Sequence, residues 1–190
     1  FSTGRELGFA RFELNHQIPP EVLEQIDNDR FSIGSLHDPC PAYTHARVLE
    51  QNPPDKKQRK EYIKMLKTMS AALVKIQRED GFWNVSLHNP ENYGGPESSG
   101  TAFFVYGMAW GINYGYLKKG KYLPAVLKGW DALVNKALHS NGFIGYMQGT
   151  GKEPKSSQPV GYDTMPNFED YGLGALLLAG SEVFKLASGD

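Results

Sequence analysis

The sequence predicts an all-α chain that forms part of an α/α toroid, in which an outer ring of helices surrounds an inner ring. Two observations predict this fold. Amphipathic segments alternate along the chain with segments that are apolar on every side, and a helix that is apolar all round is buried all round. A turn of the form Asp/Asn-Gly-Phe also recurs 61 residues apart, at Gly81 and Gly142. Such a period is typical of folds that stack one helical unit on the next.

The segment from Arg59 to Glu79 is predicted to be an outer helix. Its apolar side chains recur every three or four residues, which places them on one stripe of a helix, and its lysines lie off that stripe. An Asp-Gly turn follows the helix. The stripe consists of Tyr62, Leu66, Met69, Leu73 and Ile76, and the lysines are Lys60, Lys64, Lys67 and Lys75.

The segment 101–117 is predicted to be an inner helix. It is rich in aromatic and glycine residues and carries no charge before Lys118. Glycine lets a sandwiched helix pack closely against its neighbours. The polar loop before it leads into the start of this helix, which is expected to face the central cavity, and loops on a rigid scaffold often carry function.

The second pair of helices repeats this order. An amphipathic segment at 121–138 is predicted to be the next outer helix, and a largely apolar segment at 171–187 the next inner helix, with glycines at 172, 174 and 180. The apolar stripe of the outer segment consists of Leu123, Val126, Leu127, Trp130, Leu133, Val134 and Ala137.

The rest of the sequence gives weaker signals. Residues 1–58 are predicted to be an irregular N-terminal segment, and residues 59–190 one domain of hairpin repeats. The net charge is −1 with mixed signs, which indicates neither a nucleic-acid partner nor an anionic membrane, and no apolar run approaches the ~20 residues that span a bilayer. Cys40 is the only cysteine and no histidine pair has metal-ligand spacing, so we expect no metal site. His37 and Asp38 are the only adjacent His/Asp pair, in a proline-rich loop that argues against catalysis.

Four stretches together resemble the C-terminal part of the unsaturated rhamnogalacturonyl hydrolases, glycoside hydrolase family 105. They are similar, more distantly, to the unsaturated glucuronyl hydrolases of family 88. The resemblance runs from about Ala46 to Ala187 and implies an (α/α)6 barrel of the six-hairpin type. The stretches are ARVLEQ, IQREDGFWNVSLHNPENYGGPESSGTAFFVYGMAWGINYGYL, YLPAVLKGWDALV and YGLGALLLAGSEVFKLA.

The resemblance implies hydrolysis of oligosaccharides from pectin degradation that end in a 4,5-unsaturated uronic acid. In the family an aspartic acid protonates the C4=C5 bond and activates a water molecule that adds at C5. The hemiketal that results opens and releases the sugar. This chemistry needs a carboxyl group with a raised pKa in a partly dry aromatic pocket, and it requires no metal or organic cofactor. The resemblance also implies a bacterial protein of the cytoplasm or periplasm.

The first half of the family's barrel has no counterpart in this sequence. The family's catalytic aspartates lie in Asp-rich and aromatic segments, and none precedes Arg59. Its Trp-(Ser/Ala)-Arg-Gly-Asn-x-Trp motif grips the substrate, but SLHDPCPAYTH stands at that place, and FSTGRELGFARF is only a faint echo. We therefore predict a partial or degenerate ring whose catalytic residue is unknown. A non-catalytic helical-repeat module that binds a sugar or a protein partner is the alternative.

The candidate substrate-binding residues lie where the polar loops enter the inner helices. Hydroxyl groups can line a sugar site there, and an aromatic ring can lie beneath the apolar face of a sugar. The same residues fit structural roles: Ser98 or Ser99 as the N-cap of the helix, the acids near a helix start, and the aromatic rings in packing. The candidates are Trp83, Tyr93, Glu97, Ser98, Ser99, Thr101 and Asp170, with Asp163 and Glu169 as further acids before the last inner helix.

Overall fold

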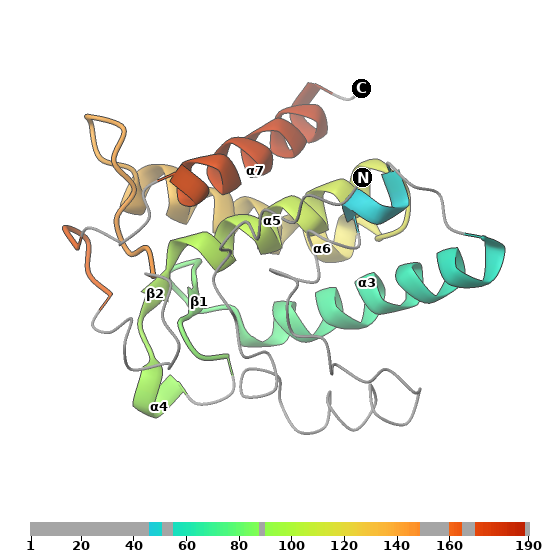
Figure 1. The fold of residues 1–190 in the computed structure, drawn as a ribbon, viewed down its shortest axis with the longest axis horizontal. Coiled ribbons are helices and arrows are strands. Elements are labelled where there is room, and N and C mark those ends of the chain that lie inside the picture. Colours follow the sequence, from blue (N-terminus) through green and yellow to red (C-terminus); the bar gives the residue numbers. More distant parts are fainter. Residues whose placement is uncertain (1–45, 51–54, 88–89, 149–159, 165–169, 189–190) are drawn as a thin grey trace, which may run out of the picture.

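The computed structural model is helical over most of the residues that it describes (Figure 1). The all-α prediction is therefore confirmed. Two helical hairpins and the loops between their helices make up most of this part of the chain. The structure describes residues 46–50, 55–87, 90–148, 160–164 and 170–188.

Four long helices form the two hairpins, and shorter elements join them. The long helices are α3 (Lys56–Ile76), α5 (Ser98–Asn113), α6 (Lys119–Ala132) and α7 (Asp170–Ser188). The shorter elements are β1 (Trp83–Asn84), α4 (Pro90–Tyr93), β2 (Pro96–Glu97), the π-helical turn η2 (Leu133–Ala137) and one helical turn at 46–50.

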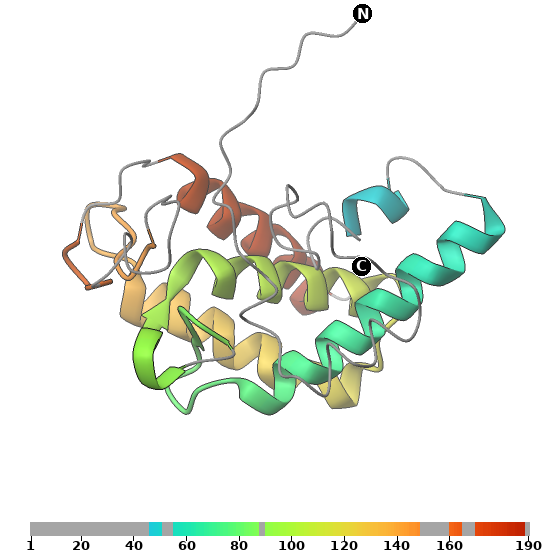
Figure 2. The ribbon, with the colours of Figure 1, turned by 60° about the horizontal axis from the view of Figure 1, so that its bottom comes forward.

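The four long helices are arranged as two layers of a toroid. Helices α5 and α7 run side by side in the same direction, and α3 and α6 run back along the outside (Figures 1 and 2). Both loops that lead from an outer helix to an inner helix therefore lie at the same end of the molecule. Strands β1 and β2 pair antiparallel at this end, with Trp83 opposite Glu97.

The predicted stripe of α3 is confirmed. Asp55 begins the helix by accepting hydrogen bonds from the amides of Lys57 and Gln58 at 2.8 and 2.9 Å. Leu66 and Leu73 are buried, and the other stripe residues pack against the core, while the four lysines are exposed. The helix lies with one side on the inner layer and the other in water.

Helix α5 is the centre of the structure and is buried along its whole length from Ser98 to Ile112. It packs against α3, α6 and α7, so the prediction of an inner helix is confirmed. Its predicted bounds, 101–117, are wrong, because the helix ends at Asn113 and Tyr114 beyond it is 46% exposed. Glycine makes the close approach possible at Gly129 of α6, where a Cβ atom would lie 2.7 Å from Val105 Cγ2 of α5.

The predicted stripe of α6 is wrong at Leu127, which is 49% exposed. The buried face of the helix is centred about one residue earlier, on Tyr122, Val126 and Gly129. The residues beside Leu127 on the predicted stripe, Leu123 and Trp130, are only partly buried. The reason is that α6 packs against α3, α5 and α7 with its other sides, and the flank of its apolar stripe that carries Leu127 has no neighbour among the described residues.

Candidate functional site

The site that the sequence singles out is the start of α5, where the polar loop enters the inner layer. The Glu97 carboxylate caps the helix. Its Oε1 accepts from the amide of Ser99 at 2.9 Å, and its Oε2 accepts from the amide of Gly100 at 2.5 Å. These amides are among the first N–H groups of the helix, which have no partner within it. Glu97, the last residue of the loop, therefore supplies the hydrogen-bond acceptors that the first amides of α5 lack.

The prediction that Ser98 or Ser99 is the N-cap is wrong, because Glu97 holds that position. Ser99 instead donates its hydroxyl to Glu97 Oε1 at 2.6 Å. Ser98 is 1% exposed, and its Oγ has no hydrogen-bond partner among the described residues. A Glu carboxylate extends two bonds further from the backbone than a Ser hydroxyl and carries two oxygens, so it can accept from two amides at once.

Trp83 and Thr101 join the loop to the helix. The Thr101 hydroxyl donates to the Glu97 carbonyl at 2.6 Å and accepts from the Trp83 amide at 3.1 Å. The Trp83 indole N–H donates to the Leu73 carbonyl of α3 at 2.9 Å, and its ring meets Phe104 edge to face. Trp83 is 1% exposed, so in this structure its ring presents no open face to a ligand. These contacts are packing contacts, and substrate contact by Trp83 stays a prediction.

The second repeat also reaches Glu97. The Gln148 amide donates to Glu97 Oε1 at 3.2 Å, and the Ser98 amide donates to the Tyr146 carbonyl at 2.8 Å. Burial raises the pKa of the Glu97 carboxyl above its usual value, and the hydrogen bonds from Ser99, Gly100 and Gln148 act in the opposite direction. A carboxylate with both oxygens engaged as acceptors acts as an anchor for the loops around it.

Tyr146 holds a strained backbone conformation beside this anchor. Its φ is 57°, which side-chain-bearing residues seldom adopt. The conformation turns its amide to the Gly161 carbonyl at 2.9 Å while its own carbonyl accepts from Ser98. Tyr146 thereby ties the start of α5 to the segment 160–164.

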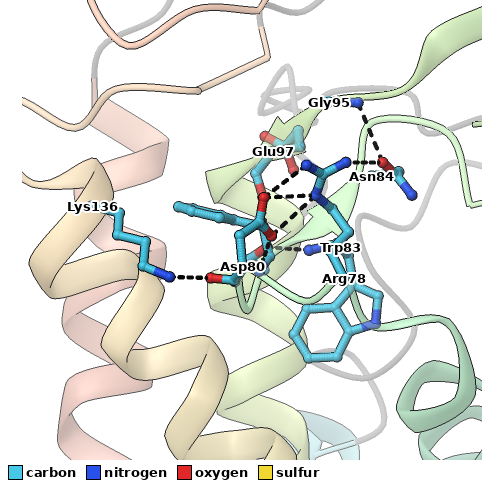
Figure 3. A network of polar contacts seen from close by, with 9 residues as sticks. Arg78, Asp80, Trp83, Asn84, Gly95, Glu97 and Lys136 are labelled. Carbon is cyan, nitrogen blue, oxygen red and sulfur yellow. Dashed lines mark hydrogen bonds and ion pairs between the residues drawn. The ribbon is translucent and has the colours of Figure 1, made fainter.

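An ion pair closes the base of the β1–β2 loop (Figure 3). Arg78 donates to the Asp80 carboxylate, with the shortest bond, from Nη2, at 2.7 Å, and to Asn84 Oδ1 at 2.6 Å. Asn84 Oδ1 also accepts from the Gly95 amide at 3.2 Å. One arginine thus connects the end of α3 to both sides of the loop.

Asp80 connects this network to the second repeat. Lys136 of η2 donates to the Asp80 carbonyl at 2.7 Å. Partial burial by itself raises the pKa of the Asp80 carboxyl, but the hydrogen bonds and charge of Arg78, with the Phe82 amide and Lys136, outweigh it and hold the pKa below its usual value. Asp80 is therefore charged at neutral pH.

A second polar cluster lies toward the opposite end of the inner helices. Glu182 of α7 is 3% exposed and accepts from Asn113 of α5 at 2.8 Å and from Lys185 at 2.6 Å. Burial and the charge of Glu50 raise the pKa of Tyr106 to about 12. The cluster fixes the rotation of α7 against α5.

The other candidates are placed less closely. Asp170 is the first residue of α7, and Tyr93 is the last residue of α4. The side chains of both lie outside the described part of the structure. Asp163 is exposed in the segment 160–164. Glu169, His37 and Asp38 lie outside the described residues. The structure therefore brings together Trp83, Glu97, Ser98, Ser99 and Thr101 from the predicted set.

The sequence reasoning missed Arg78, Asn84, Tyr146 and Gln148. Arg78 and Asn84 flank the Asp-Gly turn that it did recognise, so a search for partners of Asp80 would have found them. Tyr146 and Gln148 carry no local signal, because their roles come from backbone groups that meet α5 through the fold. Among the described residues, no three His, Cys, Asp or Glu side chains gather as metal ligands would, and no helix is long and apolar enough to cross a membrane.

Comparison with known proteins agrees with the fold and with the sequence resemblance. The sequence profile described as Glycosyl Hydrolase Family 88 matches residues 41–187. A protein of Formosa agariphila named unsaturated 3S-rhamnoglycuronyl hydrolase is 41% identical over 141 residues, which are 74% of this chain and 36% of that protein. The chain thus spans about a third of the length of this curated relative.

Solved structures show the same architecture. A glycosyl hydrolase family 88 structure from Bacteroides vulgatus superposes with a TM-score of 0.70 at 34% identity, over 96% of this chain and 51% of that chain. A possible member of family 105 from Salmonella enterica superposes with a TM-score of 0.64 at 24% identity, over 77% of this chain and 38% of that chain, which shows the shared fold. The predicted resemblance to families 105 and 88 and the predicted six-hairpin fold, present here as a partial ring, are both confirmed.

Proposed function

Since the chain belongs to Glycosyl Hydrolase Family 88, we propose that it acts in the hydrolysis of oligosaccharides that end in an unsaturated uronyl group. The observation that carries the proposal is the family match across residues 41–187, which includes the Glu97 anchor and both loops at the same end of the inner helices. The name of the Formosa agariphila relative supports an unsaturated rhamnoglycuronyl substrate. The resemblance to family 105 supports an unsaturated rhamnogalacturonyl one.

The chemistry would be hydration of the C4=C5 bond, followed by opening of the hemiketal. We assign no catalytic acid within this chain. The proposed contribution of the chain is the wall of the sugar site at the loop end, with Tyr93 and Asp170 as the candidate sugar contacts. The other candidates would support that wall from beneath, because all five are buried: Trp83, Glu97, Ser98, Ser99 and Thr101.

A non-catalytic helical module that binds a sugar or a protein partner is the second candidate. The sequence supports it, because no Asp-rich, aromatic segment of the kind that holds the family's catalytic aspartates precedes Arg59. In this case the domain of residues 59–190 would bind without turnover, and residues 1–58 would remain a separate segment.

Both candidates are tested by one assay on the full chain. An unsaturated rhamnoglycuronyl disaccharide and a lyase-digested rhamnogalacturonan oligosaccharide are incubated with the protein, and the ultraviolet absorbance of the C4=C5 bond is followed. The Formosa agariphila relative serves as the positive control. Loss of absorbance with either sugar supports the hydrolase. Binding measured by calorimetry without loss of absorbance supports the non-catalytic module, and neither binding nor turnover contradicts both.

A further inference from the structure

Each of the two repeats holds the base of its loop with a side chain from the same place in the turn. Arg78 and His139 are 61 residues apart, as Gly81 and Gly142 are, and their carbonyls accept from the amides of these glycines at 3.1 and 2.9 Å. We infer that Arg78 and His139 are positioning residues that hold the two loops beside the proposed sugar site. The inference rests on the proposed function and adds to it the residues that order those loops.

Both loops are closed at their base by one backbone hydrogen bond. In the first loop the Val85 amide donates to the Gly95 carbonyl at 3.1 Å, and in the second the Tyr146 amide donates to the Gly161 carbonyl at 2.9 Å. Val85 and Tyr146 are again 61 residues apart. A single hydrogen bond of this kind closes a loop only weakly, because closure costs conformational entropy. Each loop base therefore depends on a further contact.

In the first repeat Arg78 supplies this contact through Asn84 (Figure 3). Arg78 Nη1 donates to Asn84 Oδ1 at 2.6 Å, and the same oxygen accepts from the Gly95 amide at 3.2 Å. Asp80 holds the guanidinium group by accepting from Nε at 3.0 Å and from Nη2 at 2.7 Å. The arginine thus fixes the oxygen atom that receives the returning end of the loop. Gly95 follows the candidate sugar contact Tyr93 by two residues.

In the second repeat His139 reaches the returning end of the loop directly. Its Nε2 lies 3.0 Å from the Tyr162 carbonyl oxygen, and Nε2 is the donor because a carbonyl only accepts. The His139 and Tyr162 rings also stack, with centroids 3.7 Å apart. Gly145 stands at the place of Asn84, and a Cβ atom there would collide with the Tyr162 carbonyl. We call the contact of Arg78 through Asn84 the first clamp, and the contact of His139 with Tyr162 the second clamp.

The clamps bear on binding more than on the core. Neither Arg78 nor His139 is fully buried, and the start of α5 is held separately by Glu97. Loops that are ordered before a sugar arrives bind it more tightly, because binding then removes less conformational freedom. A loop that holds its binding conformation for about a tenth of the time weakens the apparent affinity about tenfold.

Matched variants of the full 190-residue chain separate the two clamps. Arg78→Ala and Asn84→Ala break the first clamp at two different points, so it can be tested even if one of them does not fold. His139→Phe keeps an aromatic ring in the second clamp and removes its donor, whereas His139→Gln keeps an N–H donor. Lys136→Ala is the control, because it removes the hydrogen bond to the Asp80 carbonyl without changing a donor or acceptor at either loop base.

Hydrogen exchange of the loop-base amides, followed by NMR, and calorimetric affinity for an unsaturated rhamnoglycuronyl disaccharide are measured for each variant. The first-clamp variants should exchange the Val85 and Gly95 amides roughly tenfold faster and leave the Tyr146 amide unchanged, because each clamp holds its own loop. His139→Phe should do the reverse, and His139→Gln should restore part of the protection. Sugar affinity should fall about tenfold when either clamp is broken and stay at the wild-type value in Lys136→Ala.

Three results would overturn the inference. The first is unchanged exchange at both loop bases. The second is faster exchange along the whole chain, because the two residues would then only stabilise the fold. The third is faster exchange at one loop with unchanged sugar affinity, because the clamp would then order a loop that the sugar does not use. A wild-type chain that binds no sugar contradicts the proposed function instead, and loop-specific exchange then supports the clamps while unchanged exchange overturns them.

Discussion

The two copies of the repeat share their turns and differ in the burial of their inner helices. In the first copy the Arg78 amide donates to the Phe82 carbonyl at 2.9 Å, and in the second the His139 amide donates to the Phe143 carbonyl at 2.7 Å. Gly81 and Gly142 have φ values of 99° and 88°. Yet α5 is buried on every side, whereas one side of α7 is exposed.

The difference shows that the geometry of a turn depends on residues close in the sequence, whereas the burial of a helix depends on residues far from it in the sequence. The Asp80 and Asn141 side chains accept from the amides of Phe82 and Phe143 at 3.2 and 3.0 Å, so each turn is built from its own few residues. Burial of an inner helix instead depends on the hairpins to both sides of it. Helix α5 lies among α3, α6 and α7, whereas α7 has only α5 and α6 as helical neighbours among the described residues.

The largest effect is expected from shortening one apolar side chain in each inner helix. Met108→Ala in α5 should lower the free energy of unfolding by about 3 kcal/mol, because Met108 is fully buried and its loss leaves a cavity. Leu177→Ala in α7 should cost about 0.5 kcal/mol or less, because 64% of Leu177 is already exposed. Urea denaturation of both variants measures the difference. Equal losses would mean that α7 is covered in solution.

Alanine at the two turn glycines should separate local strain from packing. Both substitutions force a side chain into a positive φ, which costs on the order of 1–2 kcal/mol. Gly81→Ala should cost about 1 kcal/mol more, because its Cβ would also meet the Lys128 carbonyl and lie 2.9 Å from Ala132 Cβ, whereas nothing lies within 4 Å at Gly142. Thermal unfolding compares the two. A larger loss for Gly142→Ala would contradict the packing difference between the copies.

The helix start in the first copy gives the next largest effect. Glu97→Ala should lower the free energy of unfolding by about 2 kcal/mol, because the buried amides of Ser99 and Gly100 lose their acceptor. The matched control is Ser98→Ala, expected within ~0.5 kcal/mol of wild type, since Ser98 Oγ has no partner among the described residues. Chemical denaturation checks both, and a costly Ser98→Ala would show that this hydroxyl has a partner.

The smallest effect is expected from the position where the two turns differ, which is Asp80 in the first turn and Asn141 in the second. Asp80→Asn makes the first turn like the second, which has Asn141. The folded-state pKa of Asp80 is lowered, so its charge stabilises the fold above the usual value of 3.8, and this contribution is lost as the pH falls through the folded pKa. The variant should therefore be slightly less stable than wild type at neutral pH and should converge with it in acid. Denaturation midpoints from neutral pH to strong acid measure this. A constant gap between the two proteins would exclude a role for the charge.

Several features of the site needed the structure because their causes are not local. Glu97 was expected near the sugar site, but its capping role depends on a loop that brings Gln148 to the same carboxylate. Trp83 was expected to flank the loop, and only the position of α3 shows that its ring is enclosed and its indole bonded to Leu73. A sequence pattern identifies an aromatic residue, but it does not tell which helix covers the ring.

The sequence by itself determined the helices, the repeated turns and the family, because each rests on spacing within a short segment or on a set of motifs read along the chain. The periodic apolar residues of α3 and the glycines at 81 and 142 are examples. Tertiary structure alone decided which apolar sides are buried. Leu127 belongs to the same apolar stripe as Val126, yet Val126 is enclosed by neighbouring helices and Leu127 is 49% exposed. Periodicity in the sequence shows that one side of a helix is apolar. Whether that side is buried depends on a neighbouring helix, and the tertiary arrangement of the hairpins determines which helix lies there.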